Sequence, residues 1–299
     1  MQTLQKTAAA GPLTSNQERR NTWLACAIIG CVILLYAPVL LSLVRQWWSE
    51  PDYSQGFVIP FISAYSLWRR RDALRQVEKR PSWTGMLVII ASLGVLCLGT
   101  VGAELFLQRI SLLGLIVGAT VWLFGWSVVR EASFPLALLL LMIPLPGVVY
   151  YQIVIPLQVL ASRIATGVLH ALNLFPVQRE GNILVLPSTS LEVAEACSGI
   201  RSMFSLLTIT AIYAYFAESR NTIRWLLCLL VLPVAVVGNA GRVVFAALSA
   251  ELAGASSVEG WAHTLSGVFL FVFSTLVIVV CHALISAMWR RFAPGGEHV

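Results

Sequence analysis

The chain has 299 residues, of which 58% are hydrophobic and only 11% are charged, and its mean hydropathy is +0.81. A soluble domain cannot bury that much apolar surface, so the composition excludes a soluble globular protein and indicates a polytopic membrane protein. The net charge of +6 does not predict a nucleic-acid partner, because the basic residues gather in short segments between apolar runs.

Apolar runs predict about eight transmembrane helices, since a bilayer core needs about 20 apolar residues in a helix. The runs are 22–44, 55–68, 84–103, 105–129, 133–150, 202–217, 223–247 and 264–288. The first is longer than a signal-peptide core and is therefore expected to be an anchor. We expect an all-α polytopic membrane protein with one transmembrane domain over 22–289, a cytoplasmic N-terminal tail over 1–21 and a cytoplasmic C-terminal tail over 290–299.

The basic residues predict the orientation of these spans. Six of them lie in the stretch WRRRDALRQVEKR at 68–80, and others lie in the tails and short loops: Arg19, Arg20, Arg130, Arg220, Arg224, Arg290 and Arg291. Lys and Arg of short loops stay on the cytoplasmic side. Eight spans with both termini in the cytoplasm put all of these residues on that side.

A longer segment, 151–196, then lies on the outer side. Its first part, PLQVLASRIATGVLHALNLF at 156–175, has helical apolar spacing with two polar interruptions, which predicts a helix lying at the outer interface or dipping into it. The part that follows alternates as a short β-hairpin does: NILVL, a turn at 187–190, then LEV.

Three polar residues reach the same depth at the outer face. Cys197, in EACSGIRS at 195–202, lies at the outer end of the sixth span. Arg242 is 18 residues beyond Arg224 in the seventh span, or about 27 Å along a helix, which places it near the outer boundary. His263 lies at the outer end of the eighth span. A thiol, a guanidinium and an imidazole are therefore expected to meet.

The other thiols and the nearest other imidazole fail this depth criterion. His282 is 19 residues past His263, about 28 Å down the same helix, and is expected at the cytoplasmic end. The remaining five cysteines lie within spans or near cytoplasmic ends, where cysteine most often acts as a small hydrophobic residue. Cys197 thus has no disulfide partner at its own depth, and an unpaired thiol on an oxidising face suggests a function.

The chemistry of a cysteine nucleophile needs these residue types. A helix N-terminus and nearby cations favour the Cys197 thiolate. His263 would accept the thiol proton and later protonate a leaving amine, and Arg242 would donate hydrogen bonds to the oxyanion formed when a carbonyl is attacked. We predict these three residues to be catalytic.

Further residues are candidates for support: Glu195, Ser198, Arg201 and Asn239. Asn239, three residues before Arg242, would orient the guanidinium. Arg201, four residues after Cys197 and so on the same helix face, is the rival to Arg242, and otherwise pairs with Glu195 or Glu192. Ser198 would contribute a hydroxyl.

Each member of the trio also has a purely structural interpretation. An interfacial His usually lies at the level of the lipid headgroups, and an Arg at a span end usually snorkels to lipid phosphate. Ionisable residues at membrane depth are nevertheless functional hypotheses by default. Gly238 and Gly241, beside Arg242, would let a neighbouring helix approach closely.

The sequence resembles the exosortase/archaeosortase family in these patches: EACSGIRS, GNAGRVV at 238–244 and HTLSG at 263–267. The stretch DYSQGFVIPFISAYSLWRRR is similar to an early segment of the family, although Gln55 stands where the family pattern has His. The segment FPLALLLLMIPLPGVVYYQIVIPLQVLAS at 134–162 and REGN at 179–182 also resemble it. The similarity covers about 45–290.

The resemblance implies a multi-pass bacterial inner-membrane cysteine protease and transpeptidase, with its active site at the periplasmic face and Cys197, Arg242 and His263 as catalytic residues. Its partners would be membrane lipid and membrane-anchored proteins with a C-terminal PEP-CTERM-type sorting signal: a Pro-Glu-Pro motif, a transmembrane helix and a basic tail. It would cleave this signal through a thioester, in connection with exopolysaccharide and biofilm systems. We expect no cofactor, and the four His and six Cys have no metal-site spacing.

The alternative is a membrane transporter or a polysaccharide export component. Its support is the number of spans and the charged residues embedded in them, such as Glu104, Arg109 and Arg163. A transporter requires no thiol, so replacement of Cys197 discriminates between the two classes.

Overall fold

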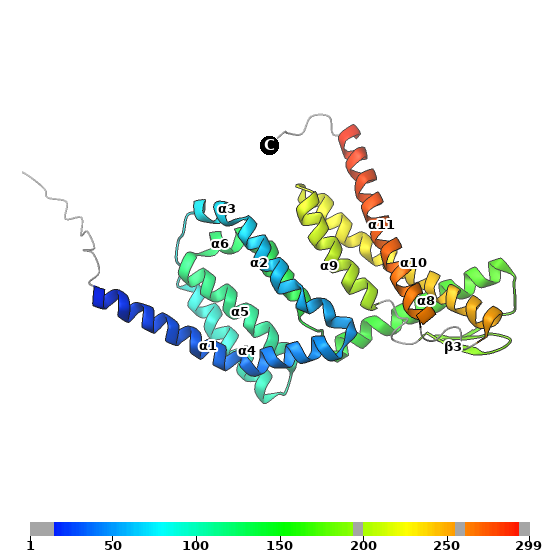
Figure 1. Ribbon diagram of the computed structural model, residues 1–299, viewed down its shortest axis with the longest axis horizontal. Helices are drawn as coiled ribbons and strands as arrows, with labels where there is room; N and C mark the ends of the chain where they lie inside the picture. Colours follow the sequence, from blue (N-terminus) through cyan, green and yellow to red (C-terminus); the bar gives the residue numbers. More distant parts are fainter. Residues whose placement is uncertain (1–14, 194–199, 255–260, 293–299) are drawn as a thin grey trace, which may run out of the picture.

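The computed structural model describes residues 15–193, 200–254 and 261–292. The first half of the chain consists of helical elements: α1 (Ser15–Ser49), η1 (Pro51–Phe57), α2 (Ile59–Arg69), α3 (Arg71–Gln76), α4 (Thr84–Val101), α5 (Leu105–Phe124), α6 (Trp126–Glu131), α7 (Ser133–Leu138) and η2 (Leu139–Met142). The second half contains a small sheet among four long helices: α8 (Gly147–Leu172), β1 (Gln178–Glu180), β2 (Ile183–Val185), β3 (Ser190–Glu192), α9 (Ile200–Ala217), α10 (Asn221–Ala253) and α11 (Trp261–Phe292) (Figure 1).

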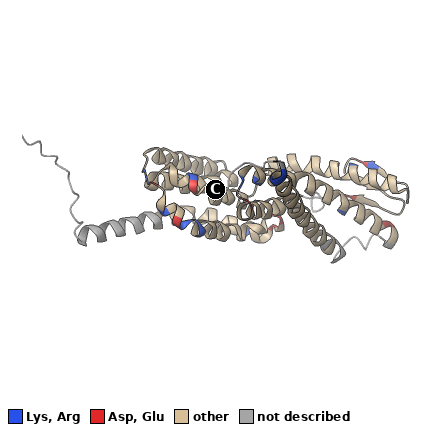
Figure 2. Ribbon diagram, turned by 90° about the horizontal axis from the view of Figure 1, so that it is seen from above, with Lys and Arg blue, Asp and Glu red and all other residues tan. Residues whose placement is uncertain are grey.

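Six helices of the described residues are long and apolar enough to cross a membrane: Gly30–Ser49, Thr84–Val101, Leu105–Phe124, Gly147–Leu172, Asn221–Leu252 and Leu265–Arg291. Two shorter apolar helices cover Ser133–Met142 and Ser202–Ala217. Charged side chains occupy only a few places along the ribbon (Figure 2). The chain is therefore a multi-pass membrane protein, with fewer full-length spans in this part of the chain than the eight expected from the runs.

Helix breaks account for two of the three expected runs that are not full-length spans, 133–150 and 55–68. The apolar run 133–150 is interrupted because Ile143, the residue before Pro144, takes an extended conformation (φ −91°, ψ 119°), as residues before proline prefer. Helix α8 starts only after Pro146. In the run 55–68, η1 occupies the start, and α2 has only 11 residues, about 16 Å of helix. Hydropathy counts residues and does not register such breaks.

Helix α10 is long enough for its two halves to pack against different parts of the molecule. Its 33 residues extend about 50 Å, which exceeds a hydrocarbon core of about 30 Å. Its second half packs against α8 and the sheet in one core cluster: Ala161, Ala165, Leu169, Val177, Leu184, Leu186, Val193, Val243, Ala247 and Ala250. Helix α8 itself is long enough to span. It was not among the expected spans, and the interfacial location expected for this segment stays a prediction.

The sheet has three antiparallel strands in the order β1-β2-β3. Strands β2 and β3 pair with Val185 opposite Ser190, within the segment expected to form a hairpin. Strand β1 was not expected, because the residues Gln-Arg-Glu carry no apolar alternation. The signal that predicts it is the pair Gly181-Asn182, a two-residue turn in which Gly181 takes φ +64°.

Helices α9, α10 and α11 form a bundle around a second core cluster: Leu206, Ala214, Ile223, Leu227, Val231, Ala235 and Ile278. The first half of the chain contacts this bundle through α9. The Ser205 hydroxyl donates a hydrogen bond to Gln55 Oε1 of η1 at 2.9 Å, and the Phe134 ring stacks on Tyr215 with 3.7 Å between centroids. These contacts fix the position of α9 at two points along its length.

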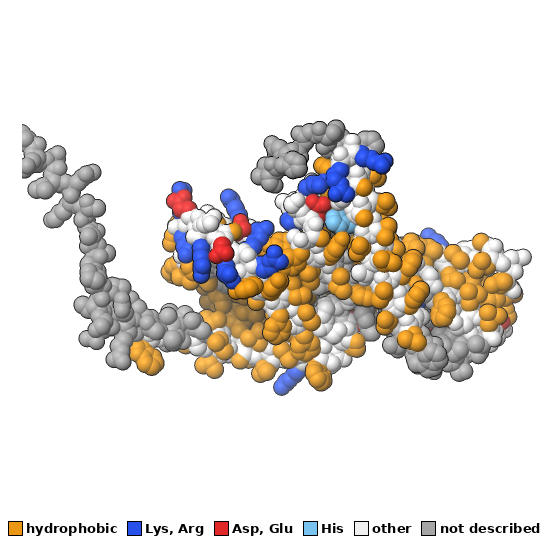
Figure 3. All heavy atoms as spheres, turned by 45° about the horizontal axis from the view of Figure 1, so that its top comes forward, with side chains coloured by type: hydrophobic (Ala, Val, Ile, Leu, Met, Phe, Trp, Pro, Cys, Tyr) orange, Lys and Arg blue, Asp and Glu red, His pale blue; other side chains and the backbone are white. Residues whose placement is uncertain are grey.

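The two edges of the molecule differ in charge. Figure 1 places α3, α6, the α9–α10 turn and the end of α11 along one edge, and the start of α11 and the sheet toward the opposite edge. Lys and Arg side chains gather in two groups on the first edge, one over α2, α3 and α6 and one over the ends of α9 and α11 (Figure 3). We call this first edge the basic edge.

Candidate functional site

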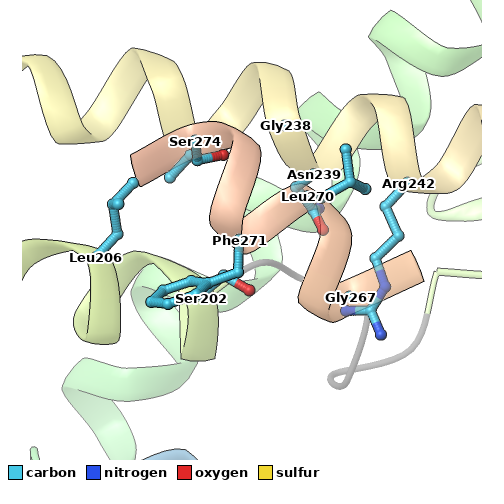
Figure 4. A pocket seen from close by; sticks show the side chains of 10 residues that line it. Ser202, Leu206, Gly238, Asn239, Arg242, Gly267, Leu270, Phe271 and Ser274 are labelled. Atoms are coloured by element: carbon cyan, nitrogen blue, oxygen red, sulfur yellow. The ribbon is translucent and has the colours of Figure 1, made fainter. Parts of the chain in front are cut away.

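A pocket lies where α9, α10 and α11 converge (Figure 4). It encloses about 340 Å³, open space included, and each of the three helices contributes to its lining: Ser202, Leu206, Ala235, Gly238, Asn239, Arg242, Gly267, Leu270, Phe271 and Ser274. Arg242 is the charged residue among them, and none carries a carboxylate.

Arg242 reaches from α10 to the first turns of α11. A Cβ atom at Gly267 would lie 3.2 Å from Arg242 Nη2 and 3.4 Å from Cζ, so the guanidinium packs on the bare backbone of α11. Figure 4 shows the side chain extended along Gly267. A Cβ at position 267 would make the guanidinium shift by a few tenths of an ångström.

Asn239 lies one turn before Arg242 on α10 and is 7% exposed. Its Nδ2 is buried and has no hydrogen-bond partner among the described residues. The hydrogen bonds of those residues include none from Asn239 to Arg242, so the orienting role expected for Asn239 gains no support from a direct contact.

The expected close helix approach occurs at Gly238, where a Cβ would lie 2.9 Å from Ser274 Oγ of α11. At Gly241 a Cβ would meet nothing within 4 Å among the described residues, so no close approach is present there. The glycines that let α11 approach α10 are thus Gly238 and Gly267, and the second is recognisable only once the helices are placed.

The expected trio is only partly within the described residues. Cys197, Glu195 and Ser198 belong to 194–199, which lies outside them, and so do the side chains of Arg201 and His263. Arg201 is in the first turn of α9 and His263 in the first turn of α11. Their neighbours line the pocket: Ser202 follows Cys197 by five residues, and Gly267 follows His263 by four. The structure therefore brings together the start of α9, the middle of α10 and the start of α11 around one pocket, and the catalytic trio stays a prediction.

A second polar cluster, which we call the Glu218 cluster, lies at the basic edge. His282 Nδ1 is 2.8 Å from the Tyr213 hydroxyl and its Nε2 is 3.3 Å from Glu218 Oε2. The Ser286 hydroxyl donates to the same carboxylate oxygen at 3.2 Å. Burial raises the pKa of the Glu218 carboxyl, but hydrogen bonds from the Arg220 backbone N–H and from His282 outweigh it, so the pKa lies below its ordinary value.

This cluster agrees with the depth expected for His282, far from the outer end of α11. It joins the α9–α10 turn to α11, so it fixes the bundle at the end opposite the pocket. Sequence analysis did not find Glu218 as its centre. The sequence feature that could have indicated it is a single acidic residue, Glu218, next to the basic residues Arg220 and Arg224.

Two of the three embedded charges that supported a transporter, Arg109 and Glu104, have local structural partners. Arg109 of α5 is 3% exposed and donates a hydrogen bond to Gln46 of α1. Glu104 accepts a bond from the Phe106 backbone N–H at 3.3 Å and so caps α5. Arg163 is exposed. These contacts connect helices and helix ends and do not form a site of converging charges.

Comparison with known proteins gives one match. A family model described as transmembrane exosortase (Exosortase_EpsH) matches residues 47–280, from the end of α1 through most of α11. No curated protein and no solved structure matches the chain. The exosortase family consists of cysteine-type membrane transpeptidases that act on proteins with C-terminal sorting signals. Since the model matches well over half of its length, the chain belongs to the transmembrane exosortase family.

Proposed function

We propose that this protein is a membrane-embedded cysteine protease and transpeptidase that cleaves the C-terminal PEP-CTERM-type sorting signal of exported proteins through a thioester at Cys197. The observation that carries the proposal is the pocket at the junction of α9, α10 and α11, which holds the Arg242 guanidinium. The segments carrying Cys197 and His263 lead directly into its lining.

Chain length supports a common site. Cys197 precedes the pocket residue Ser202 by five residues, which span at most about 18 Å even when fully extended. His263 precedes Gly267 by four residues on α11, one helical turn or about 6 Å along the axis, and the Arg242 guanidinium rests on Gly267. The position of His263 on α11 is thus one turn from the residue against which the guanidinium lies.

The chemistry follows from these positions. His263 takes the proton of the Cys197 thiol, and the sulfur attacks the carbonyl carbon of the sorting signal. The carbonyl oxygen becomes an oxyanion that accepts hydrogen bonds from Arg242. When the tetrahedral intermediate collapses, the C–N bond breaks and His263 protonates the departing amine. The substrate helix is released, and an amine or water then resolves the thioester and restores the thiol.

We propose that this chemistry takes place at the periplasmic face of the bacterial inner membrane. By the positive-inside rule the basic edge would face the cytoplasm, as would both tails. The start of α11, next to the pocket, lies toward the opposite edge (Figure 1). A substrate anchored by its own transmembrane helix diffuses in the membrane plane and presents its Pro-Glu-Pro motif at this depth. The substrate proteins would belong to exopolysaccharide and biofilm systems.

The sheet offers a docking edge for the extended motif by strand addition. Strand β2 is central and paired on both sides, so the edge cannot be at 182–186 and must be β1 or β3. The Ser188 hydroxyl donates to Glu251 Oε2 at 2.7 Å, which ties the β2–β3 turn to the end of α10.

The test is cleavage of a tagged sorting-signal reporter in membranes. Cys197→Ala should abolish cleavage while the protein level in the membrane stays normal, because the thiol is the nucleophile and the change is small. Cys228→Ala is the matched control and should cleave normally, since Cys228 lies near the basic edge. Cleavage by a well-expressed Cys197→Ala variant would refute the mechanism.

A further inference from the structure

The side-chain amide of Asn239 is buried and lacks a hydrogen-bond acceptor among the described residues. The side chain is 7% exposed, and its Nδ2 has no hydrogen-bond partner among the described residues. A buried donor left unsatisfied costs about 1–3 kcal/mol, whereas an apolar side chain of similar shape does not carry this penalty. An Asn at this position therefore destabilises the empty pocket, and this cost is offset when a ligand brings an acceptor.

The pocket determines what kind of ligand that is. Arg242 and Asn239 both line it; a guanidinium has only N–H donors and a carboxamide presents two more. None of the lining residues is a carboxylate. A lining rich in donors suits a ligand that carries acceptor oxygen, and a peptide carbonyl is the acceptor that a sorting signal brings.

The spacing of the two residues suits a single oxygen. Positions three apart on a helix are neighbours, with about 5–6 Å between their Cβ atoms. Two side chains on that face can therefore converge on one atom in the pocket. Gly267, which has no side chain, lets the guanidinium lie against the α11 backbone at this side of the pocket.

We propose that Asn239 is a further catalytic residue, whose Nδ2 donates a hydrogen bond to the oxyanion of the scissile carbonyl together with Arg242. The proposal rests on the thioester mechanism at Cys197. Because the oxygen gains its negative charge only in the tetrahedral intermediate, the Nδ2–H bond strengthens there and lowers the barrier more than it tightens substrate binding.

The experiment uses the full-length protein in detergent micelles and a reporter with a C-terminal sorting signal at varied concentration. Asn239→Leu keeps the approximate shape and removes the donor. We expect kcat to fall about 10²–10³-fold, the range found when one oxyanion donor is removed, with KM little changed and thermal stability equal or higher. Thr208→Ala, a change at a buried polar residue of α9 that does not line the pocket, should keep kcat close to that of the parent.

Three results would overturn the proposal. One is a parental kcat for Asn239→Leu, and another is a raised KM with unchanged kcat, which would make Asn239 a binding residue. The third is a loss of activity that parallels a loss of stability. Asn239→Ala gives a second measurement, and failure of both variants to accumulate would assign a structural role instead. Cys197→Ala is assayed in parallel: cleavage by that variant refutes the thioester mechanism, whereas an inactive Cys197→Ala beside an active Asn239→Leu refutes only the role of Asn239.

Discussion

Arg242 illustrates how much a charge rule can say about one residue. Its distance from Arg224 predicted that it lies near one end of the spans, and the structure places its guanidinium against Gly267, four residues after His263. The buried donor of Asn239 could not be predicted in the same way. Whether a side-chain N–H finds an acceptor depends on which atoms of the neighbouring helices face it, and hydropathy contains no information about that.

The identity of the oxyanion-stabilising arginine is testable by a conservative change. Arg242→Lys keeps the positive charge but loses the planar fork of donors that fits an oxyanion. We expect a loss of about 10²–10³-fold in cleavage rate. Arg201→Lys should retain more activity, because Arg201 is assigned only a supporting role.

The measurement is reporter cleavage by membranes containing equal amounts of each variant. If Arg201→Lys proves the more damaging change in folded protein, the roles of the two arginines must be exchanged. Equal and severe losses in both variants would instead place both guanidinium groups at the reacting oxygen.

At the scale of elements, the helical character and the position of most helices were predictable from apolar runs, and the breaks were not. Prolines and the η1 turn shorten two of the expected spans, as the extended backbone at Ile143 shows. Helix α8 was expected as an interfacial segment. It packs on the second half of α10, which is available because α10 is longer than the bilayer core is thick. That length follows from Asn221–Ala253 having no break, although Pro233 lies inside it.

The contact between α10 and α11 at the pocket predicts different effects for two glycines. A Cβ at Gly267 would press on the Arg242 guanidinium at 3.2 Å, whereas a Cβ at Gly241 would meet nothing within 4 Å among the described residues. Gly267→Ala should therefore displace the guanidinium and reduce cleavage. Gly241→Ala should leave cleavage unchanged and stabilise the helix by up to about 1 kcal/mol, since Ala is the better helix former.

Both variants favour helix, so their difference isolates the geometry at Arg242. Cleavage rate and thermal stability are measured side by side. Gly267→Ala with full activity would show that the guanidinium need not rest on the α11 backbone, and an inactive Gly241→Ala would mean that residues outside the described ranges contact α10 there.

At the scale of the whole molecule, two polar sites mark opposite ends of one bundle. The Glu218 cluster joins α11 to the α9–α10 turn at the basic edge, and the pocket lies about one membrane thickness away along α10. A bundle fixed at its basic end keeps the three pocket-lining helices in register with one another. Charge distribution predicted this polarity from the sequence, because Lys and Arg recur at alternate loops.

The polarity of the whole molecule gives the last prediction. Each of two exposed positions, Arg75 in α3 and Glu192 in β3, is replaced by cysteine in a variant whose native cysteines are changed to alanine. An impermeant thiol reagent added to intact spheroplasts should label Glu192→Cys, because the sheet lies on the pocket side. It should label Arg75→Cys only after permeabilisation, because the basic edge faces the cytoplasm. The two positions control for each other, since each must react fully in permeabilised cells. The reverse pattern would place the pocket on the cytoplasmic side, where the thiol would face a reducing compartment and an exported sorting signal could not be processed after translocation.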